Sequence, residues 1–500
     1  MISTAIRRAY LLFALFLISS SLCLAQEEES LPPSFIKARG LPYPGIIHIH
    51  SYISQGGVYP FRRLVSLAQD KGIKILVFSD TFLHHWEYGL PVLSNIFKVS
   101  TEERSVVKYG IKNYLKDLKK IRGEFPDMLI LEGVEVAPFY WWSGSPFKKN
   151  LSLNDWSKHL LVIGLKSYQD YAHLPVVGNR YSMPQLKDVF SLLAPAVLVI
   201  LGIVLLRKRK PRRFLGFALN IAGILFLFNL LPFSASRYSP YHGQKQFFPY
   251  QDLINYVNKK GGLVFWAHPM LGEEKEFSKK FFTINFYTLA YPESLMLTSG
   301  YAGFGTDMQA TTSDNLILAG GEWDKVLKSY CQGKSNQPVW VIGEADYRSG
   351  NRIDSVQNIF FLSELNPQSA FEALRNGKLY VRSYSENSIN ISLHDFHIED
   401  SQNKNKFAFM GDKVKIIGRP RLCIKGNCAI NPTVNLKVEM IRDGKIIKEF
   451  EFTNEKTFNL EFQDDSLEIY GRKSYYRLNF FADGKIILVT NPIFIELRNE

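Results

Sequence analysis

Gly45-Ile46-Ile47-His48-Ile49-His50 has the pattern of a short apolar strand that ends in two histidines separated by one residue. Alternate side chains of a β-strand point to the same face, so we expect both imidazoles to lie on one face. Two imidazoles placed in this way can chelate a divalent ion. A single His-x-His motif is weak evidence, because it also occurs in strands for structural reasons.

Strand-like and helix-like segments alternate after this first strand. Apolar residues at helical spacing over residues 59–71 are followed by a buried-type strand at residues 73–78. Further strand-like runs cover residues 128–136, 160–165, 263–266 and 339–342, and further helical patterns cover residues 106–121, 250–259, 323–330 and 367–376. Repeated strand–helix units predict parallel strands covered by helices, in a barrel or an open sheet.

Histidine and carboxylate side chains stand at the ends of these predicted strands. They are Asp80 after the second strand, Glu135 at the end of the third, His159 at the edge of residues 160–165, His268 after residues 263–266, and Asp346 after residues 339–342. In α/β barrels the C-terminal strand ends form the active face. Any one of these residues could be a satisfied core residue, but the whole set predicts a metal site.

Two uncharged apolar stretches interrupt the strand–helix pattern. Residues 189–206 and 214–233 contain 18 and 20 residues, and the connector 207–213 carries six Lys or Arg residues. As helices they would be about 27 and 30 Å long, close to the hydrocarbon thickness of a bilayer. The basic connector suits the cytoplasmic side of a membrane hairpin. The alternative is a pair of buried core helices.

The N-terminus has the layout of a secretory signal. Arg7 and Arg8 precede an apolar run at residues 9–24, and cleavage after Ala25 is expected. The alternatives are an uncleaved anchor and, less compatible with the bulky Leu22, a lipoprotein signal.

The predicted units are a signal peptide (1–25), a first barrel part (26–188), the membrane hairpin (189–233), a second barrel part (234–385) and a β domain (386–500). Both barrel parts and the β domain would then lie on the outer, extracytoplasmic side of the cell membrane.

Composition and charge exclude several classes of protein. The 500 residues are 46% hydrophobic and 21% charged, which excludes a disordered polymer or a coiled coil. Four cysteines exclude a disulfide-stapled domain. The connector and the N-terminal pair hold eight cations of the net charge of +13, which leaves an ordinary +5. Nucleic-acid binding is not expected, since no aromatic platform accompanies the basic run.

The pattern changes near residue 389 to β-like runs without helical periodicity. Asp443-Gly444 and Asp483-Gly484 are typical hairpin turns, and we predict a small β-sandwich with no chemistry of its own. Cys423 and Cys428 flank a predicted turn. They either pair across a hairpin or remain thiols, depending on the strand register.

The order of the motifs resembles the PHP (polymerase and histidinol phosphatase) family. Over residues 44–382 the chain has His-x-His after the first strand, a motif similar to Thr-Asp-His, a Gly-x-Glu, two isolated histidines and a late Asp-x-His-like motif. The resemblance implies a distorted (β/α)7 TIM-like barrel, here interrupted by the membrane hairpin. It also implies hydrolysis of phosphate esters by a cluster of two or three metal ions.

Carried over to this chain, the resemblance implies two metal positions. His48, His50, Glu135 and Asp346 match the ligands of one ion, and Glu135 bridges to a second ion completed by His159 and His268. The third position is expected to be absent, because its histidines are replaced by Thr81 and Arg348. We therefore expect two divalent ions, and the mixed His and carboxylate ligands suit zinc, manganese or iron.

Three further predictions concern residues near these ligands. Arg348 would grip a phosphate, or alternatively form a salt bridge to Glu344 or another acid. Asp80 would orient a histidine or carry a proton, or alternatively cap a strand end. His84 or His85 would restore a metal ligand, or alternatively lie exposed in a loop.

The predicted function is that of an exported, membrane-tethered metal-dependent phosphoesterase. Its partners would be a phosphorylated small molecule or a phosphodiester and the membrane lipid. An amidohydrolase-type barrel is an alternative, but Glu135 stands on an early strand and no lysine takes that place. A degenerate barrel that acts as a non-catalytic envelope scaffold is the other alternative, favoured by the lost third-site ligands.

Overall fold

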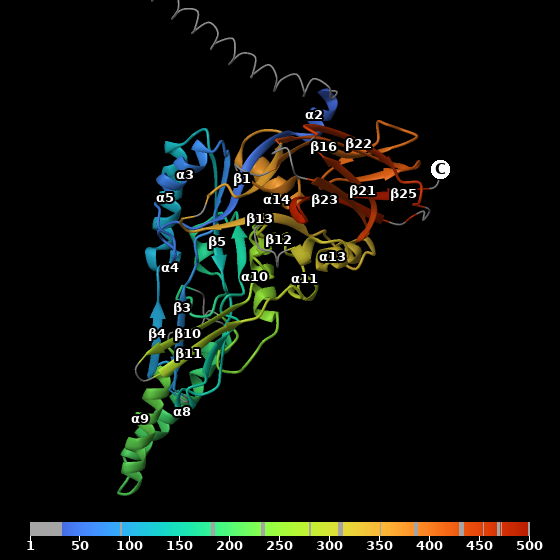
Figure 1. The fold of residues 1–500 in the computed structure, drawn as a ribbon. Helices are drawn as coiled ribbons and strands as arrows, with labels where there is room; N and C mark the ends of the chain where they lie inside the picture. The colour runs from blue at the N-terminus through green and yellow to red at the C-terminus, as the bar shows by residue number, and fades with distance from the viewer. Residues whose placement is uncertain are drawn as a thin grey trace, which may run out of the picture.

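The computed structural model contains a central β-barrel, an appended β-rich region and a projecting helical hairpin (Figure 1). It describes residues 33–90, 93–181, 186–231, 236–279, 282–308, 314–350, 352–384, 389–429, 435–453, 455–467, 471 and 473–498. The predicted signal peptide lies outside the described residues.

Seven strands close the barrel, in the order β13, β12, β9, β8, β5, β2, β1 and back to β13. Their bounds are β1 (Leu41–Ile49), β2 (Ile75–Phe78), β5 (Leu129–Val136), β8 (Leu160–Ile163), β9 (Leu263–Trp266), β12 (Gly303–Thr306) and β13 (Trp340–Tyr347). All residues of β2, β8 and β9 are buried, as expected for short apolar runs that are covered on both faces.

The predicted (β/α)7 barrel is wrong, because the closed barrel is mixed. β8 runs antiparallel to both β5 and β9, whereas the other neighbouring pairs are parallel. The strands β6 (Trp141–Ser143) and β7 (Leu151–Asn154) connect β5 to β8 in place of an α-helix. The chain therefore re-enters the barrel at the end where β5 leaves it. A four-residue apolar run carries no signal of its direction, so the sequence could not reveal this reversal.

Helices cover the outside of the barrel where apolar residues recur at helical spacing. The longer ones are α3 (Phe61–Asp70), α5 (Ile111–Glu124), α10 (Phe248–Lys259), α13 (Glu322–Cys331) and α14 (Pro367–Asn376). α14 shows how local sequence sets the ends: the Asn366 side chain accepts a hydrogen bond from Ser369 N, and Gly377 follows the last turn at a φ of 68°. Shorter turns are α2 (Pro33–Arg39), α4 (Val106–Tyr109), α6 (Tyr168–Ala172), α7 (Leu186–Ser191), α11 (Ser294–Leu297), α12 (Asp314–Ile317) and the 3-10 turn η2 (Pro146–Lys148).

The C-terminal region consists of two sheets that share one apolar core. The barrel sheet continues from β1 through β14 (Val356–Leu362), β15 (Leu379–Ser383), β24 (Lys485–Thr490), β23 (Lys473–Ala482), β20 (Asn435–Arg442) and β21 (Lys445–Thr453), with β18 (Lys413–Ile416) and β25 (Ile493–Leu497) at its side. The second sheet has the order β17 (Phe407–Phe409), β16 (Asn390–Asp400), β19 (Pro420–Ala429) and β22 (Thr457–Gln463).

The predicted turn between Cys423 and Cys428 is wrong. Both residues lie in the single strand β19, and both thiols are free. Four residues of extended chain lie between them and keep them about 16 Å apart, far beyond the reach of a disulfide.

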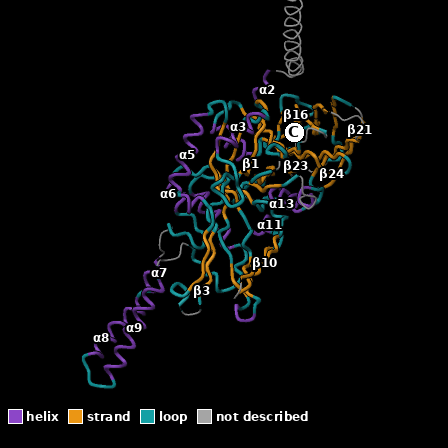
Figure 2. Tube along the Cα trace, turned by 60° about the vertical axis from the view of Figure 1, so that its left-hand side comes forward, coloured by secondary structure: helices purple, strands orange, loops and turns teal. Residues whose placement is uncertain are grey.

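A second group of strands extends from the barrel toward the helical hairpin (Figures 1 and 2). It comprises the hairpin β3 (His85–Gly89)–β4 (Lys98–Glu102) and a sheet in the order β10 (Glu273–Lys279), β11 (Phe282–Thr288), β7, β6. We call these six strands the distal lobe. The lobe has its own aromatic core, which includes Trp86, Tyr140 and Trp142.

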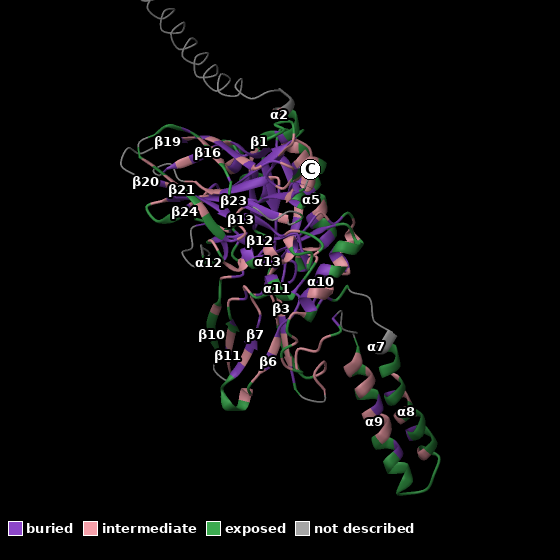
Figure 3. Ribbon diagram, turned by 90° about the vertical axis from the view of Figure 1, so that its right-hand side faces the viewer, coloured by how far each residue is buried: buried purple, intermediate pink, exposed green. Residues whose placement is uncertain are grey.

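The projecting hairpin consists of α8 (Leu193–Leu206) and α9 (Arg212–Leu230). The spans Val189–Leu206 and Arg212–Leu230 are long and apolar enough to cross a membrane, and only 11% of each is buried. The exposed helices contrast with the buried barrel in Figure 3, so the alternative of core helices is wrong. Their contact is made by small residues: a side chain at Gly202 or Gly216 would collide with the facing helix.

Candidate metal centre

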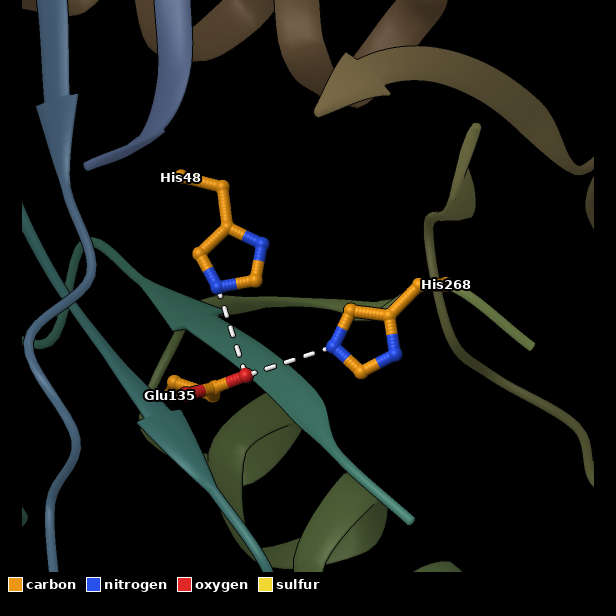
Figure 4. Close-up of side chains that lie close together, drawn as sticks. All are labelled: His48, Glu135 and His268. Carbon is orange, nitrogen blue, oxygen red and sulfur yellow. Dashed lines mark hydrogen bonds and ion pairs between the residues drawn. The ribbon is translucent and has the colours of Figure 1, made fainter. Parts of the chain in front are cut away.

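The predicted metal ligands gather at one end of the barrel. They are His48, His50, Glu135, His159, His268 and Asp346. Figure 4 shows His48 and His268 directed at the Glu135 carboxylate. His159 joins this end because it precedes the reversed strand β8, so it lies beside the C-terminal ends of β5 and β9.

Glu135 is the centre of the cluster and is 1% exposed. Its Oε1 lies 2.8 Å from His159 Nδ1, 3.3 Å from His48 Nε2 and 3.4 Å from His268 Nε2. Its Oε2 lies 3.6 Å from His50 Nε2. A carboxylate with imidazoles beside both of its oxygens has the arrangement that a bridging ligand requires.

Two groups of side chains could each hold a metal ion. One contains His48, Glu135 and His268, and the other contains His48, His50 and Asp346; in each group the ligand atoms lie within 4.8 Å of one another. Asp346 Oδ1 is 3.0 Å from His50 Nε2 and 3.6 Å from His48 Nε2. His48 belongs to both groups, so it lies between the two candidate metal positions and could serve either of them.

The donor atoms fit a divalent cation. Within the described residues, the buried Nε2 atoms of His48 and His50 make no hydrogen bond, although carboxylate oxygens lie close by. Imidazole nitrogens that converge without a hydrogen-bond partner are costly to bury unless a ligand satisfies them. Imidazole nitrogens combined with carboxylate oxygens suit zinc, manganese or iron.

The electrostatics of the cluster also favour a cation. Burial alone would raise the pKa of Glu135, but His159 and His48 hold it well below its usual value. Burial alone would lower the pKa of His48, but Asp346 and Glu135 raise it well above 6.5. The carboxylate of Glu135 thus remains ionised, and the imidazole of His48 holds a proton that a bound metal ion would displace.

Three of these ligands have an unusual backbone conformation. The φ angles are 70° for His48, 29° for His268 and 35° for Asp346. The pairing of β1 with β2 and β13 shifts register between Ile47 and Ile49, so regular strand alternation does not place the two histidines as predicted. The bulge at His48 instead brings the rings of His48 and His50 to a centroid distance of 4.9 Å. Such strain costs of order 1–3 kcal/mol per residue and typically marks functional sites.

A buried carboxylate beneath the cluster, Glu344, was not predicted as a site residue. Its Oε1 lies 3.2 Å from His48 Nδ1, and its Oε2 accepts a hydrogen bond of 2.7 Å from His268 N. Holding the Nδ1 proton of His48 leaves Nε2 free to bind a metal. Its position two residues before Asp346 on β13 was the only available signal in the sequence.

Asp80 orients a histidine through a serine. Its carboxylate is fully buried and accepts hydrogen bonds of 2.7 Å from Ser51 N and Ser54 Oγ. Ser54 Oγ lies 3.1 Å from His50 Nδ1 and also accepts from Thr81 N. Since the serine proton goes to Asp80, His50 donates Nδ1–H to Ser54, and its Nε2 is available as a ligand. Asp80 does not line the cleft, which disfavours a role as proton carrier.

Arg348 lies beside the cluster at the surface of the cleft. Its Nη2 is 3.1 Å from Asp346 Oδ1 and 3.6 Å from Glu135 Oε2, and its Nη1 donates to Gln55 O. The predicted alternative of a salt bridge to an acid is therefore correct in kind, but the partner is Asp346 rather than Glu344. With 32% of its side chain exposed, Arg348 can also meet a ligand in the cleft.

The two histidines considered as replacement ligands lie outside both groups. His84 lines the cleft, where burial and the neighbouring His159 lower its pKa to about 4. His85 lies 3.5 Å from Glu87 within the distal lobe.

A cleft of about 930 Å³ opens at the cluster. Glu135, His159, His268, Asp346 and Arg348 line one end, and aromatic and charged side chains of the distal lobe line much of the rest. No protein-family model matches this chain, and no curated protein matches it. The donor atoms and the cleft therefore carry the functional assignment.

Proposed function

We propose that the protein is a membrane-tethered, metal-dependent phosphoesterase, related to the PHP family that its motif order resembles. The observation that carries this proposal is the convergence of unpartnered imidazole nitrogens on Glu135 and Asp346, with Arg348 beside them. Two acidic ligands and one fixed guanidinium at the end of an open cleft suit a substrate that carries a phosphate.

Divalent ions held by these ligands would activate water and neutralise the charge of phosphoryl oxygens. His48, His50 and Asp346 would hold one ion, and Glu135 would be shared with a second position beside His159 and His268. Glu344 and the pair Asp80–Ser54 fix the imidazole tautomers. Arg348 would exchange its contact with Asp346 for a phosphoryl oxygen and so orient the ester.

We further propose that α8 and α9 span the membrane. Their apolar surfaces are exposed, and the connector at residues 207–213 carries six cations. The positive-inside rule then favours a cytoplasmic connector and a barrel on the outer side. Accessibility of a cysteine introduced into the connector, from either side of sealed vesicles, tests this orientation.

Metal content tests the proposed function. Elemental analysis of the detergent-purified protein should find about two equivalents of a divalent metal. The variant His48→Ala/His50→Ala should lose them, whereas the exposed His242→Ala should not. Hydrolysis of p-nitrophenyl phosphate and bis-p-nitrophenyl phosphate should follow the metal. No bound metal after loading with zinc or manganese would favour the non-catalytic scaffold instead.

A further inference from the structure

The cleft does not end at the metal centre but continues along the distal lobe. It is lined by consecutive residues of β10 from Glu273 to Phe277. Phe277 pairs with Ile284, which in turn pairs with Leu151 at the far end of the sheet. The opposite end of the sheet adjoins the centre, because Ser157 N, two residues before His159, donates to Thr288 Oγ1. The cleft is thus a groove that leads from the centre toward the tip of the lobe.

Four aromatic side chains line this groove among polar and charged ones: Trp86, Trp156, Phe277 and Phe286. Phe286 lies between Trp86 and Trp156, with ring centroids 6.3 and 6.2 Å away. Charged side chains also line the groove: three glutamates and one lysine of β10 (residues 273–276), and Glu103. The aromatic rings suit a substrate with an apolar part, whereas the glutamates disfavour a polyanion such as a nucleic acid.

The tip of the lobe exposes apolar side chains next to lysines. Phe147 is 89% exposed and is followed by the exposed Lys148 and Lys149. The lobe has a second tip between β3 and β4. There, Leu90 and Phe97 are 47% and 56% exposed. Exposed apolar residues flanked by lysines are typical of segments that rest in the interface of a lipid bilayer.

The second tip is attached to the hairpin that we assign to the membrane. Asn95 N donates to Asn229 Oδ1 at 2.9 Å, and Asn95 Nδ2 donates to Asn229 O at 2.6 Å. Asn229 lies at the C-terminal end of α9, where this helix would leave the bilayer. Figures 1 and 3 both show the lobe on the side of the barrel from which α8 and α9 project.

Building on the proposed function, we propose that the substrate is a phosphate ester carried by a lipid of the same bilayer. The distal lobe rests on the membrane surface, and the groove leads the headgroup from that surface to the metal centre. The aromatic rings of the groove contact the apolar part of the lipid next to the headgroup, while Arg348 and the metal ligands receive the phosphate.

The test uses the full chain reconstituted in phosphatidylcholine vesicles with zinc or manganese. The lipids phosphatidic acid and phosphatidylethanolamine are compared with their water-soluble counterparts, glycerol phosphate and glycerophosphoethanolamine. We expect at least about tenfold higher kcat/KM for a lipid than for its soluble counterpart. Equal efficiency on both would overturn the lipid assignment but leave the proposed function intact. No hydrolysis of these four substrates or of the p-nitrophenyl esters would overturn the proposed function itself.

A variant of the tip separates membrane contact from chemistry. Phe147→Asp should lower hydrolysis of the lipid about tenfold, because an acid replaces the exposed ring at the bilayer surface. Hydrolysis of p-nitrophenyl phosphate should stay within twofold, since Phe147 does not line the cleft. The control is Ile446→Asp, at a 44% exposed apolar position on β21 in the C-terminal region, away from the distal lobe. An equal loss in both variants, or no loss in Phe147→Asp, would contradict the membrane contact.

Discussion

The barrel and the C-terminal region both bury charged side chains, but they surround them differently. Arg477 on β23 is fully buried and donates to Asp324 Oδ1 at 2.9 Å and Oδ2 at 2.8 Å. It also donates to Asn479 Oδ1 at 2.9 Å, and Tyr475 OH donates to the same Asp324. Every strong donor and acceptor of this cluster has a partner, so it joins α13 to β23 as a purely structural contact.

The cluster around Glu135 has the opposite character. Nε2 of His48 and His50 have no hydrogen-bond partner among the described residues, and His48, His268 and Asp346 have positive φ. A buried polar cluster that is closed by hydrogen bonds stabilises the fold, whereas one that is strained and unsatisfied is suited to bind a ligand. The following predictions test this difference.

The largest effect is expected at Glu135. Glu135→Gln should remove both metal ions and lower phosphoester hydrolysis by about 1000-fold or more, since metal ions contribute several kcal/mol to such reactions. His159→Ala should mainly empty one position. Elemental analysis and kcat/KM measure the effect, and Glu103→Gln, which lines the same cleft outside both groups, serves as the control. Full metal content in Glu135→Gln would refute the assigned cluster.

Arg477→Ala should cost about 3–5 kcal/mol of unfolding free energy, because it leaves Asp324 buried without its cation. The metal content of the folded protein should not change. The double variant Arg477→Met/Asp324→Leu should be less destabilised than Arg477→Ala, since no unpaired charge remains. Chemical denaturation measures both variants. A loss below 1 kcal/mol for Arg477→Ala would show that this pair is not the closed contact described above.

His397 should make stability depend on pH. Burial alone would lower the pKa of His397, but its hydrogen bond of 2.8 Å with Asp395 raises the pKa to about 9. The pair of His397 and Asp395 contributes at most about 3 kcal/mol to the free energy of unfolding. This stabilisation is fully present below pH 6.5 and is lost as the pH rises through about 9. Denaturation at pH 6 and pH 10 should show the loss in the wild type and in His242→Gln. Asp395→Asn should largely abolish it, and an unchanged pH dependence in that variant would argue against the pair.

The smallest effect is expected at the serine that links Asp80 to His50. Ser54→Ala should weaken metal binding by about 10–100-fold, because His50 loses the acceptor that fixes its tautomer. Ser79→Ala is a matched control, since its buried hydroxyl has no hydrogen-bond partner among the described residues. Competition with a chelator measures the affinity. Equal affinities in the two variants would show that Ser54 only fills space.

Much of the candidate site could be predicted from the residue types at strand ends. His48, His50, Glu135, His268 and Asp346 follow apolar runs whose burial is evident from composition, and the structure brings them together. Glu344 and Ser54 were missed because their roles depend on which imidazole nitrogen they face. That relation arises only when β1 and β13 pair.

The sequence by itself determined the local character of each segment: buried strands, amphipathic helices, two apolar spans and a β-rich C-terminal region. These properties depend on neighbouring residues and on composition. Only the tertiary structure decided the direction of β8, the bulge at His48 and the extension of the cleft along the distal lobe. Strand direction and side-chain convergence depend on which distant segments pair, and short apolar runs are compatible with several pairings.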